Sequence, residues 1–148
     1  MEKYNRPVDI LLVEDNPGDV RLTQEAFRDS RLPVKLSVVM DGEDALNYLF
    51  RRGNYADVTK PDIILLDLNI PKKDGKEVLS EIKNDDVLKY VPVVVLTTSN
   101  AEQDIVKTYN LNVNAYINKP VDFDKFFDIV QKIEAFWLMT ATLPSNSY

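Results

Sequence analysis

Three carboxylates stand directly after apolar runs of the sequence. Glu14 and Asp15 follow the run Val8–Val13. Asp67 follows the run Ile63–Leu66. An apolar run without polar alternation predicts a strand covered on both faces, so the acid after it lies at a strand end. If the two strands are neighbours, three anions meet at one edge of a sheet, and a divalent cation with a preference for oxygen ligands, such as Mg²⁺, offsets their repulsion.

Two further polar side chains follow apolar runs later in the chain. Thr97 follows the run Val91–Leu96, and Lys119 follows the weaker run Val113–Asn118. A hydroxyl and an ammonium beside a metal-bound carboxylate form a cradle for a phosphoryl group. No single residue of this set is strong evidence for a site. Acidic residues in particular are common in this chain, at 24 of 148. The prediction depends on the convergence of four strand ends.

The composition excludes several other chemistries. The chain has no cysteine and no histidine, which excludes disulfides, thiol nucleophiles, Cys-type zinc sites and phosphohistidine. The net charge of −6 argues against a surface for nucleic acid. The basic pairs Arg51–Arg52 and Lys72–Lys73 are expected in loops or at helix ends. The N-terminus is polar and no apolar run approaches transmembrane length, so we expect a cytoplasmic protein without a membrane segment.

The elements that position these residues alternate along the chain. The apolar runs predict strands over Val8–Val13, Val34–Met40, Ile63–Leu66, Val91–Leu96 and Val113–Asn118. Helices are predicted between and after them, over about residues 17–30, 43–52, 76–83, 101–109 and 122–138. Such alternation predicts an α/β fold, a flavodoxin-like doubly wound (βα)5 three-layer sandwich with a parallel sheet of order 2-1-3-4-5.

Local signals predict where some helices begin and end. Asn16–Pro17, Asp74 and Asp122 are expected at helix starts, and Gly53 is expected to close the second helix. Residues 54–60 are predicted to form a polar loop. In a sheet of order 2-1-3-4-5 the topological switch point lies between the first and third strands, so the three carboxylates are predicted to meet there.

This set of residues resembles the receiver domain of two-component response regulators. The acid pair Glu14–Asp15, the acid Asp67, the hydroxyl of Thr97 and the lysine Lys119 have the order and spacing of that family. The loop sequence IPKKDG also fits its pattern. The resemblance covers about residues 8–138 and implies a receiver domain there, with an N-terminal extension over 1–7 and a C-terminal tail over 139–148.

The resemblance implies a role for each site residue. Asp67 is the phospho-acceptor, and Asp15, Asp67 and the backbone carbonyl of Asn69 hold Mg²⁺, with Glu14 acting through a metal-bound water. The resemblance also implies roles for three residues that are not acidic. They are Thr97 and Lys119, which contact the phosphoryl group, and Tyr116, the aromatic switch.

The resemblance also implies a signalling protein rather than an enzyme, although such a domain transfers a phosphoryl group to itself from a donor and can release it. No output domain follows, so a stand-alone receiver that acts through protein contacts is expected. The loop 54–60, the triplet Thr97–Ser99 and the segment EAFWLMTATLP resemble the small receivers of phytochrome-class sensor histidine kinases. The expected partners are such a kinase, a downstream protein and a second copy of the chain, bound through the last helix and the tail.

Two other functions use similar residues. A haloacid-dehalogenase-type phosphatase also has a nucleophilic Asp, Mg²⁺, a hydroxyl and a lysine, but it needs a second carboxylate two residues after the nucleophile, where this chain has Asn69. A flavodoxin-like cofactor binder needs a phosphate loop rich in Gly, Ser and Thr after the first strand. The sequence EDNPGD at that place is acidic and would repel phosphate in the absence of a metal.

Overall fold

The computed structural model describes residues 7–28, 33–97, 115–118, 128 and 131–132. Its strands are β1 (Val8–Val13), β2 (Val34–Val39), β3 (Ile63–Asp67), β4 (Val93–Thr97) and β5 (Ala115–Asn118). Its α-helices are α1 (Pro17–Arg28), α2 (Gly42–Leu49) and α3 (Gly75–Asn84), and its short 3₁₀ helices are η1 (Gly53–Tyr55) and η2 (Leu88–Tyr90).

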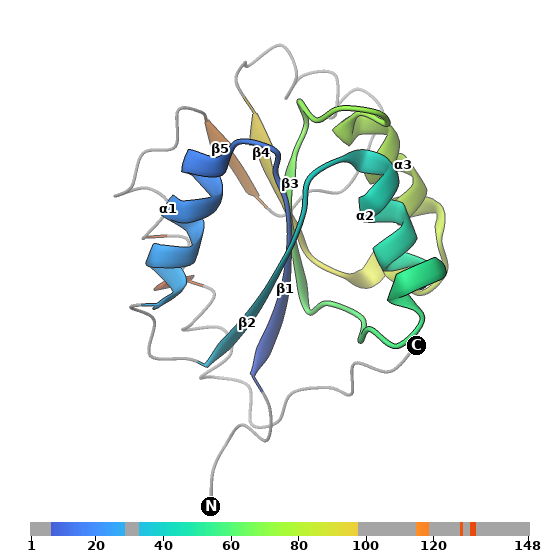
Figure 1. Cartoon of the computed structure of the whole chain (residues 1–148), viewed down its shortest axis with the longest axis horizontal. Helices are drawn as coiled ribbons and strands as arrows, with labels where there is room; N and C mark the ends of the chain where they lie inside the picture. The colour runs from blue at the N-terminus through green and yellow to red at the C-terminus, as the bar shows by residue number, and fades with distance from the viewer. Residues whose placement is uncertain (1–6, 29–32, 98–114, 119–127, 129–130, 133–148) are drawn as a thin grey trace, which may run out of the picture.

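Within the described residues the strands form one sheet in which every neighbouring pair is parallel, with the order β2-β1-β3-β4-β5. This is the predicted order. Helix α1 covers one face of the sheet, and α2 and α3 cover the other, so the molecule has three layers (Figure 1). The predicted doubly wound α/β fold is confirmed.

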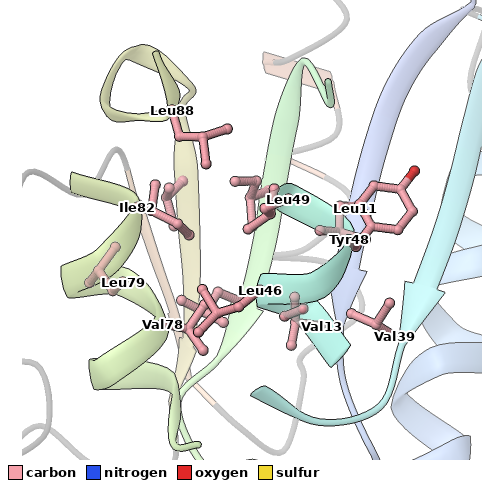
Figure 2. Packing of buried hydrophobic residues seen from close by; sticks show 14 of the residues in the cluster. Leu11, Val13, Val39, Leu46, Tyr48, Leu49, Val78, Leu79, Ile82 and Leu88 are labelled. Carbon is pink, nitrogen blue, oxygen red and sulfur yellow. The ribbon is translucent and has the colours of Figure 1, made fainter. Parts of the chain in front are cut away.

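The uninterrupted apolar runs are explained by the two cores that the sheet separates. In β1, Leu11 and Val13 pack into the cluster under α2 and α3, whereas Ile10 and Leu12 pack into the cluster under α1. All of these side chains are buried. Figure 2 shows the first cluster, with side chains of α2 and α3 facing the strands. The central strands therefore lack polar alternation because successive side chains enter different cores.

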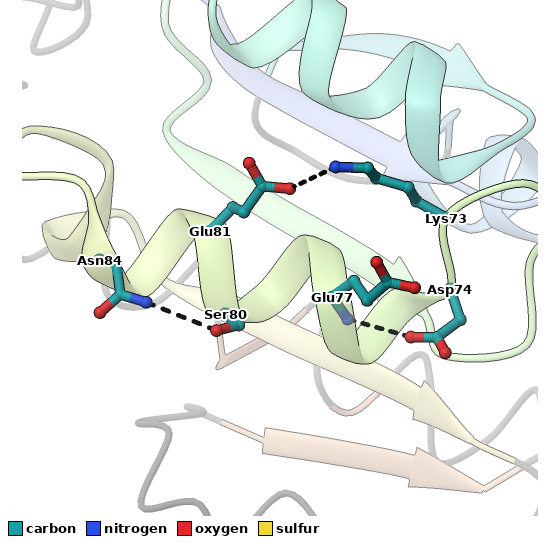
Figure 3. A network of polar contacts seen from close by, with 6 residues as sticks. All are labelled: Lys73, Asp74, Glu77, Ser80, Glu81 and Asn84. Atoms are coloured by element: carbon teal, nitrogen blue, oxygen red, sulfur yellow. Dashed lines mark hydrogen bonds and ion pairs between the residues drawn. The ribbon is translucent and has the colours of Figure 1, made fainter.

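Two predicted helix starts are confirmed by their caps. The Oδ1 of Asn16 accepts hydrogen bonds from the backbone N–H groups of Gly18 and Asp19 at 2.9 and 3.1 Å. The Oδ1 of Asp74 accepts from the backbone N–H of Glu77 at 3.0 Å, as Figure 3 shows. Each short polar side chain satisfies N–H groups that the first helical turn leaves without partners.

The predicted end of the second helix is wrong. Helix α2 ends at Leu49, and the closing residue is Arg51 rather than Gly53. Arg51 adopts a left-handed conformation with φ 57°, and the N–H of Arg52 donates to the carbonyl of Asn47 at 2.8 Å. This is a Schellman ending in which an arginine occupies the position that glycine usually takes. The guanidinium of Arg51 donates to the carbonyl of Ala56, which holds this conformation.

Three strands, β2, β3 and β4, have bounds that differ slightly from the predicted ones. β2 ends at Val39, one residue early, whereas β3 and β4 include Asp67 and Thr97 as their last residues. β4 begins only at Val93 because Pro92 has no N–H to donate to the ladder, although its carbonyl accepts from Ile64 at 3.0 Å. The two chemically important side chains therefore belong to the strands themselves.

The predicted loop 54–60 also contributes two side chains to the core. Tyr55 and Val58 pack against the core, and the ring of Tyr55 lies 5.1 Å from the ring of Tyr48, measured between centroids. The hydroxyl of Thr59 donates to the carboxylate of Asp9, which is buried in β1. The loop thus covers part of the core with Tyr55 and Val58, while Asn54, Ala56, Asp57 and Thr59 are exposed.

Four predicted segments lie wholly or mostly outside the described residues: the helix over 101–109, most of the helix over 122–138, the N-terminal extension except for Pro7, and the tail. Asp128, Gln131 and Lys132 are described as helical and exposed, which agrees with a polar face of the last predicted helix. Among the helices that the structure describes, none has the length and apolar character needed to cross a membrane.

Candidate functional site

The three predicted carboxylates meet at the carboxyl edge of the sheet. Glu14, Asp15 and Asp67 each offer a carboxylate oxygen, and these oxygens all lie within 4.8 Å of one another. The sheet register explains this arrangement, because Val13 pairs with Leu66 and the acids follow directly on the two strands. The prediction that these side chains converge is confirmed.

The environments of the three acids differ. Glu14 and Asp67 are 0% and 1% exposed, whereas Asp15 is exposed. The Oε2 of Glu14 accepts from the backbone N–H of Asn16 at 3.2 Å, and the Oδ1 of Asp67 accepts from the backbone N–H of Asn69 at 2.9 Å. Buried carboxylates that lie this close together repel one another strongly, and a bound cation relieves the repulsion.

The chain after Asp67 is held to the sheet by its backbone. The N–H of Leu68 donates to the carbonyl of Leu96 at 3.0 Å, and the carbonyl of Leu68 accepts from the N–H of Gly75 at 3.0 Å. The side chains of Leu68 and Ile70 are buried. Asn69, whose carbonyl is the predicted third metal ligand, therefore lies between two anchored residues.

The structure also describes the predicted hydroxyl and the predicted switch tyrosine. Thr97 is fully buried at the end of β4, one residue past Leu96, the register partner of Asp67. Tyr116 of β5 is half-buried and packs against the core cluster under α2 and α3, and this burial raises the pKa of its hydroxyl. Lys119 follows the last residue of β5 and lies outside the described residues.

This edge of the sheet has the chemistry of a divalent-cation site. The three carboxylates offer only oxygen ligands, which Mg²⁺ prefers, and Asp15 is open to the solvent from which an ion would enter. The donor set therefore fits Mg²⁺. Inspection of the sequence did not single out Gly42, which only the structure brings against the loop after Asp67.

Comparisons with known proteins agree with this geometry. Residues 10–131 match the family described as response regulator receiver domain. The response regulator Rcp1 of Synechocystis sp. is 48% identical over 144 residues, which are 97% of this chain and 98% of the relative.

Two solved structures are similar over nearly the whole chain. One is the phosphorylated cyanobacterial phytochrome response regulator RcpA, with a TM-score of 0.80 and 54% identity, covering 95% of this chain and all of the other. The other is the Mn²⁺-bound form of Rcp1, with a TM-score of 0.79 and 49% identity, covering 94% of this chain and all of the other. The chain therefore belongs to the response regulator receiver domain family and is homologous to phytochrome response regulators.

Proposed function

We propose that this receiver accepts a phosphoryl group on Asp67 from a sensor histidine kinase of the phytochrome class. The single observation that carries the assignment is the group of three carboxylates at the carboxyl edge of the sheet, to which β3 contributes the buried Asp67. The similarity to a phosphorylated phytochrome response regulator supports the choice of reaction and of kinase class.

In the proposed reaction an oxygen of Asp67 forms a bond to the phosphorus of the donor. The bond between phosphorus and the donor's leaving atom breaks, and the donor departs with that electron pair. The product is an acyl phosphate on Asp67. The hydrogen bond from the N–H of Asn69 to Oδ1 helps to orient the carboxylate of Asp67.

The remaining site residues support this step. Asp15, Asp67 and the carbonyl of Asn69 would hold Mg²⁺ directly, and Glu14 would act through a water. The ion would offset negative charge on the phosphoryl oxygens. The similarity to an Mn²⁺-bound response regulator supports a divalent metal at this place.

The proposed change that transmits the signal involves Thr97 at the end of β4 and Tyr116 of β5. We propose that the hydroxyl of Thr97 donates to the attached phosphoryl group and that Lys119 pairs with it. Tyr116 then turns further into the core and changes the surface that a downstream protein contacts. We also propose a homodimer through the last helix, 122–138, and the tail. The apolar residues expected to take part are Ile129, Phe136, Leu138, Met139 and Leu143.

The assignment of Asp67 is tested by incubating the chain with acetyl phosphate and measuring its intact mass. We expect one phosphoryl group on the wild type in the presence of Mg²⁺ and none after Mg²⁺ is removed by a chelator. The isosteric variant Asp67→Asn should remain unmodified, and equal modification of both proteins would refute the assignment. Asp15→Asn is expected to weaken Mg²⁺ binding more than Glu14→Gln, because only Asp15 is proposed as a direct ligand.

A further inference from the structure

We infer that Gly42, the first residue of α2, is a positioning residue for the loop 68–74 and so for the carbonyl of Asn69. The inference rests on the proposed function, because Asn69 matters only if its carbonyl holds the metal. Gly42 contacts Pro71 and Lys73, which lie toward the end of the loop that is farther from Asp67. It is not adjacent in sequence to any of the three carboxylates. Its role would be indirect, through the backbone path of the loop.

The contact between Gly42 and the loop is made by backbone atoms. The N–H of Gly42 donates to the carbonyl of Pro71 at 3.2 Å. A Cβ added to Gly42 would lie 1.8 Å from the carbonyl oxygen of Lys73 and 2.6 Å from its carbonyl carbon. Real Cβ atoms essentially never approach another atom closer than 3.0 Å. Since the neighbour is backbone, no side-chain rotation can relieve this clash, and the loop itself must move.

The loop cannot move freely because its two ends are also held. A Cβ on Gly75 would lie 2.4 Å from the Cα of Leu68 and 2.6 Å from the carbonyl oxygen of Asp67. Lys72 in the middle of the loop adopts a left-handed conformation with φ 69°, which persists only where its surroundings enforce it. Because both ends of the loop are held, a displacement at Lys73 must be taken up within residues 69–73.

Asp41 adds a second link between α2 and the same loop. Its Oδ1 accepts from the backbone N–H of Asp44 at 2.7 Å and so caps α2. Its Oδ2 lies 3.6 Å from the Nζ of Lys72, whose side chain is 60% exposed. Such an exposed ion pair contributes little, so the close approach of Gly42 is the dominant constraint.

The direct test is the affinity for Mg²⁺ of the variant Gly42→Ala, measured by isothermal titration calorimetry without a phosphodonor. We expect binding about tenfold weaker than in the wild type, because outer contacts that orient metal ligands are typically worth about 10- to 100-fold in affinity. The matched control is Gly53→Ala. Gly53 also has a backbone that disfavours alanine, with φ 56°, but has no atom within 4 Å of an added Cβ. Its substitution is expected to lower stability and leave Mg²⁺ affinity unchanged.

A wild-type affinity in Gly42→Ala would overturn the inference, and so would an equal loss of affinity in Gly53→Ala. If Gly42→Ala does not fold, the wild type provides the test by NMR during Mg²⁺ titration. The amide resonances of Gly42 and Lys73 are expected to shift with the same midpoint as that of Asn69, and unshifted resonances of Gly42 and Lys73 would refute the coupling. Failure of the proposed function is a separate result, because it would appear as absent Mg²⁺ binding or unselective phosphorylation in the wild type.

Discussion

Two loops of the molecule are held in place by different means. The loop 68–74, which follows the proposed phospho-acceptor, is held by backbone hydrogen bonds and by two glycines that allow close approach. The loop 50–62, which follows α2, also has backbone hydrogen bonds, such as that from the N–H of Asp62 to the carbonyl of Asp9 at 2.7 Å, but three of its side chains hold it as well. The guanidinium of Arg51 donates a hydrogen bond to the carbonyl of Ala56. The hydroxyls of Tyr55 and Thr59 donate hydrogen bonds to the carboxylates of Asp44 and Asp9, respectively.

This difference corresponds to what each loop has to position. The proposed task of the first loop is to orient a backbone carbonyl, and contacts made by the backbone constrain that orientation most directly. The second loop covers apolar surface, and three of its side chains add anchors to its backbone hydrogen bonds. We therefore expect substitutions in the first loop to lower stability mainly by steric clashes with the backbone. Substitutions in the second loop are expected to lower it mainly by the loss of side-chain hydrogen bonds.

The largest effect is expected for Gly75→Ala. An added Cβ would meet the backbone of Asp67 and Leu68 at 2.6 and 2.4 Å, so helix α3 and the end of β3 must separate. Overpacking of this kind costs about 3 kcal/mol of unfolding free energy. Urea unfolding measures the loss, with Gly53→Ala as the comparison in the other loop. If Gly75→Ala is no less stable than Gly53→Ala, the proposed difference between the loops is wrong.

A smaller effect is expected for Tyr55→Phe. The hydroxyl of Tyr55 donates to the Oδ2 of Asp44 at 2.8 Å, while its ring packs on the core. Removing a hydrogen bond to a charged group costs about 1.5 kcal/mol, and the ring contacts remain. Urea unfolding gives the stability, and the Mg²⁺ affinity is expected to stay at the wild-type value. A weakened affinity would show that the two loops are not independent.

The same tyrosine is expected to make stability depend on alkaline pH. Burial and the bond to Asp44 raise the pKa of Tyr55 to about 12. The folded state therefore holds this proton more tightly than the unfolded state, whose pKa is about 10. The resulting stability is fully present below about pH 10 and is lost as the pH rises toward about 12. The stability difference between wild type and Tyr55→Phe should shrink over this range, and a constant difference contradicts the assignment.

The smallest effect is expected for the ion pair between loop 68–74 and helix α3. The Nζ of Lys73 lies 3.0 Å from the Oε2 of Glu81, as Figure 3 shows, but the two side chains are 46% and 41% exposed. A double-mutant cycle with Lys73→Ala and Glu81→Ala should give a coupling of about 0.5 kcal/mol or less that decreases with salt. A coupling well above 1 kcal/mol would mean that side chains also hold the first loop.

Much of the fold could be predicted from the sequence because its signals are local. The apolar runs of β1 and β3 and the caps at Asn16 and Asp74 depend on residues close together in the chain. The end of α2 could not be predicted in the same way. Arg51 replaces the expected glycine because its own side chain reaches Ala56, and propensity alone does not reveal such a contact.

The sequence by itself determined which groups are available for chemistry. It provides Glu14, Asp15 and Asp67 at strand ends and no histidine or cysteine, and the alternation of strands and helices implies that the acids share one edge. The tertiary structure alone decided how close their oxygens come and what supports them. Gly42 and Lys73 are far apart in the chain, and only folding brings their backbones into contact. The contact is so close that it leaves no room for a Cβ on Gly42. Residue types and local patterns determine chemistry, whereas packing between distant segments determines geometry.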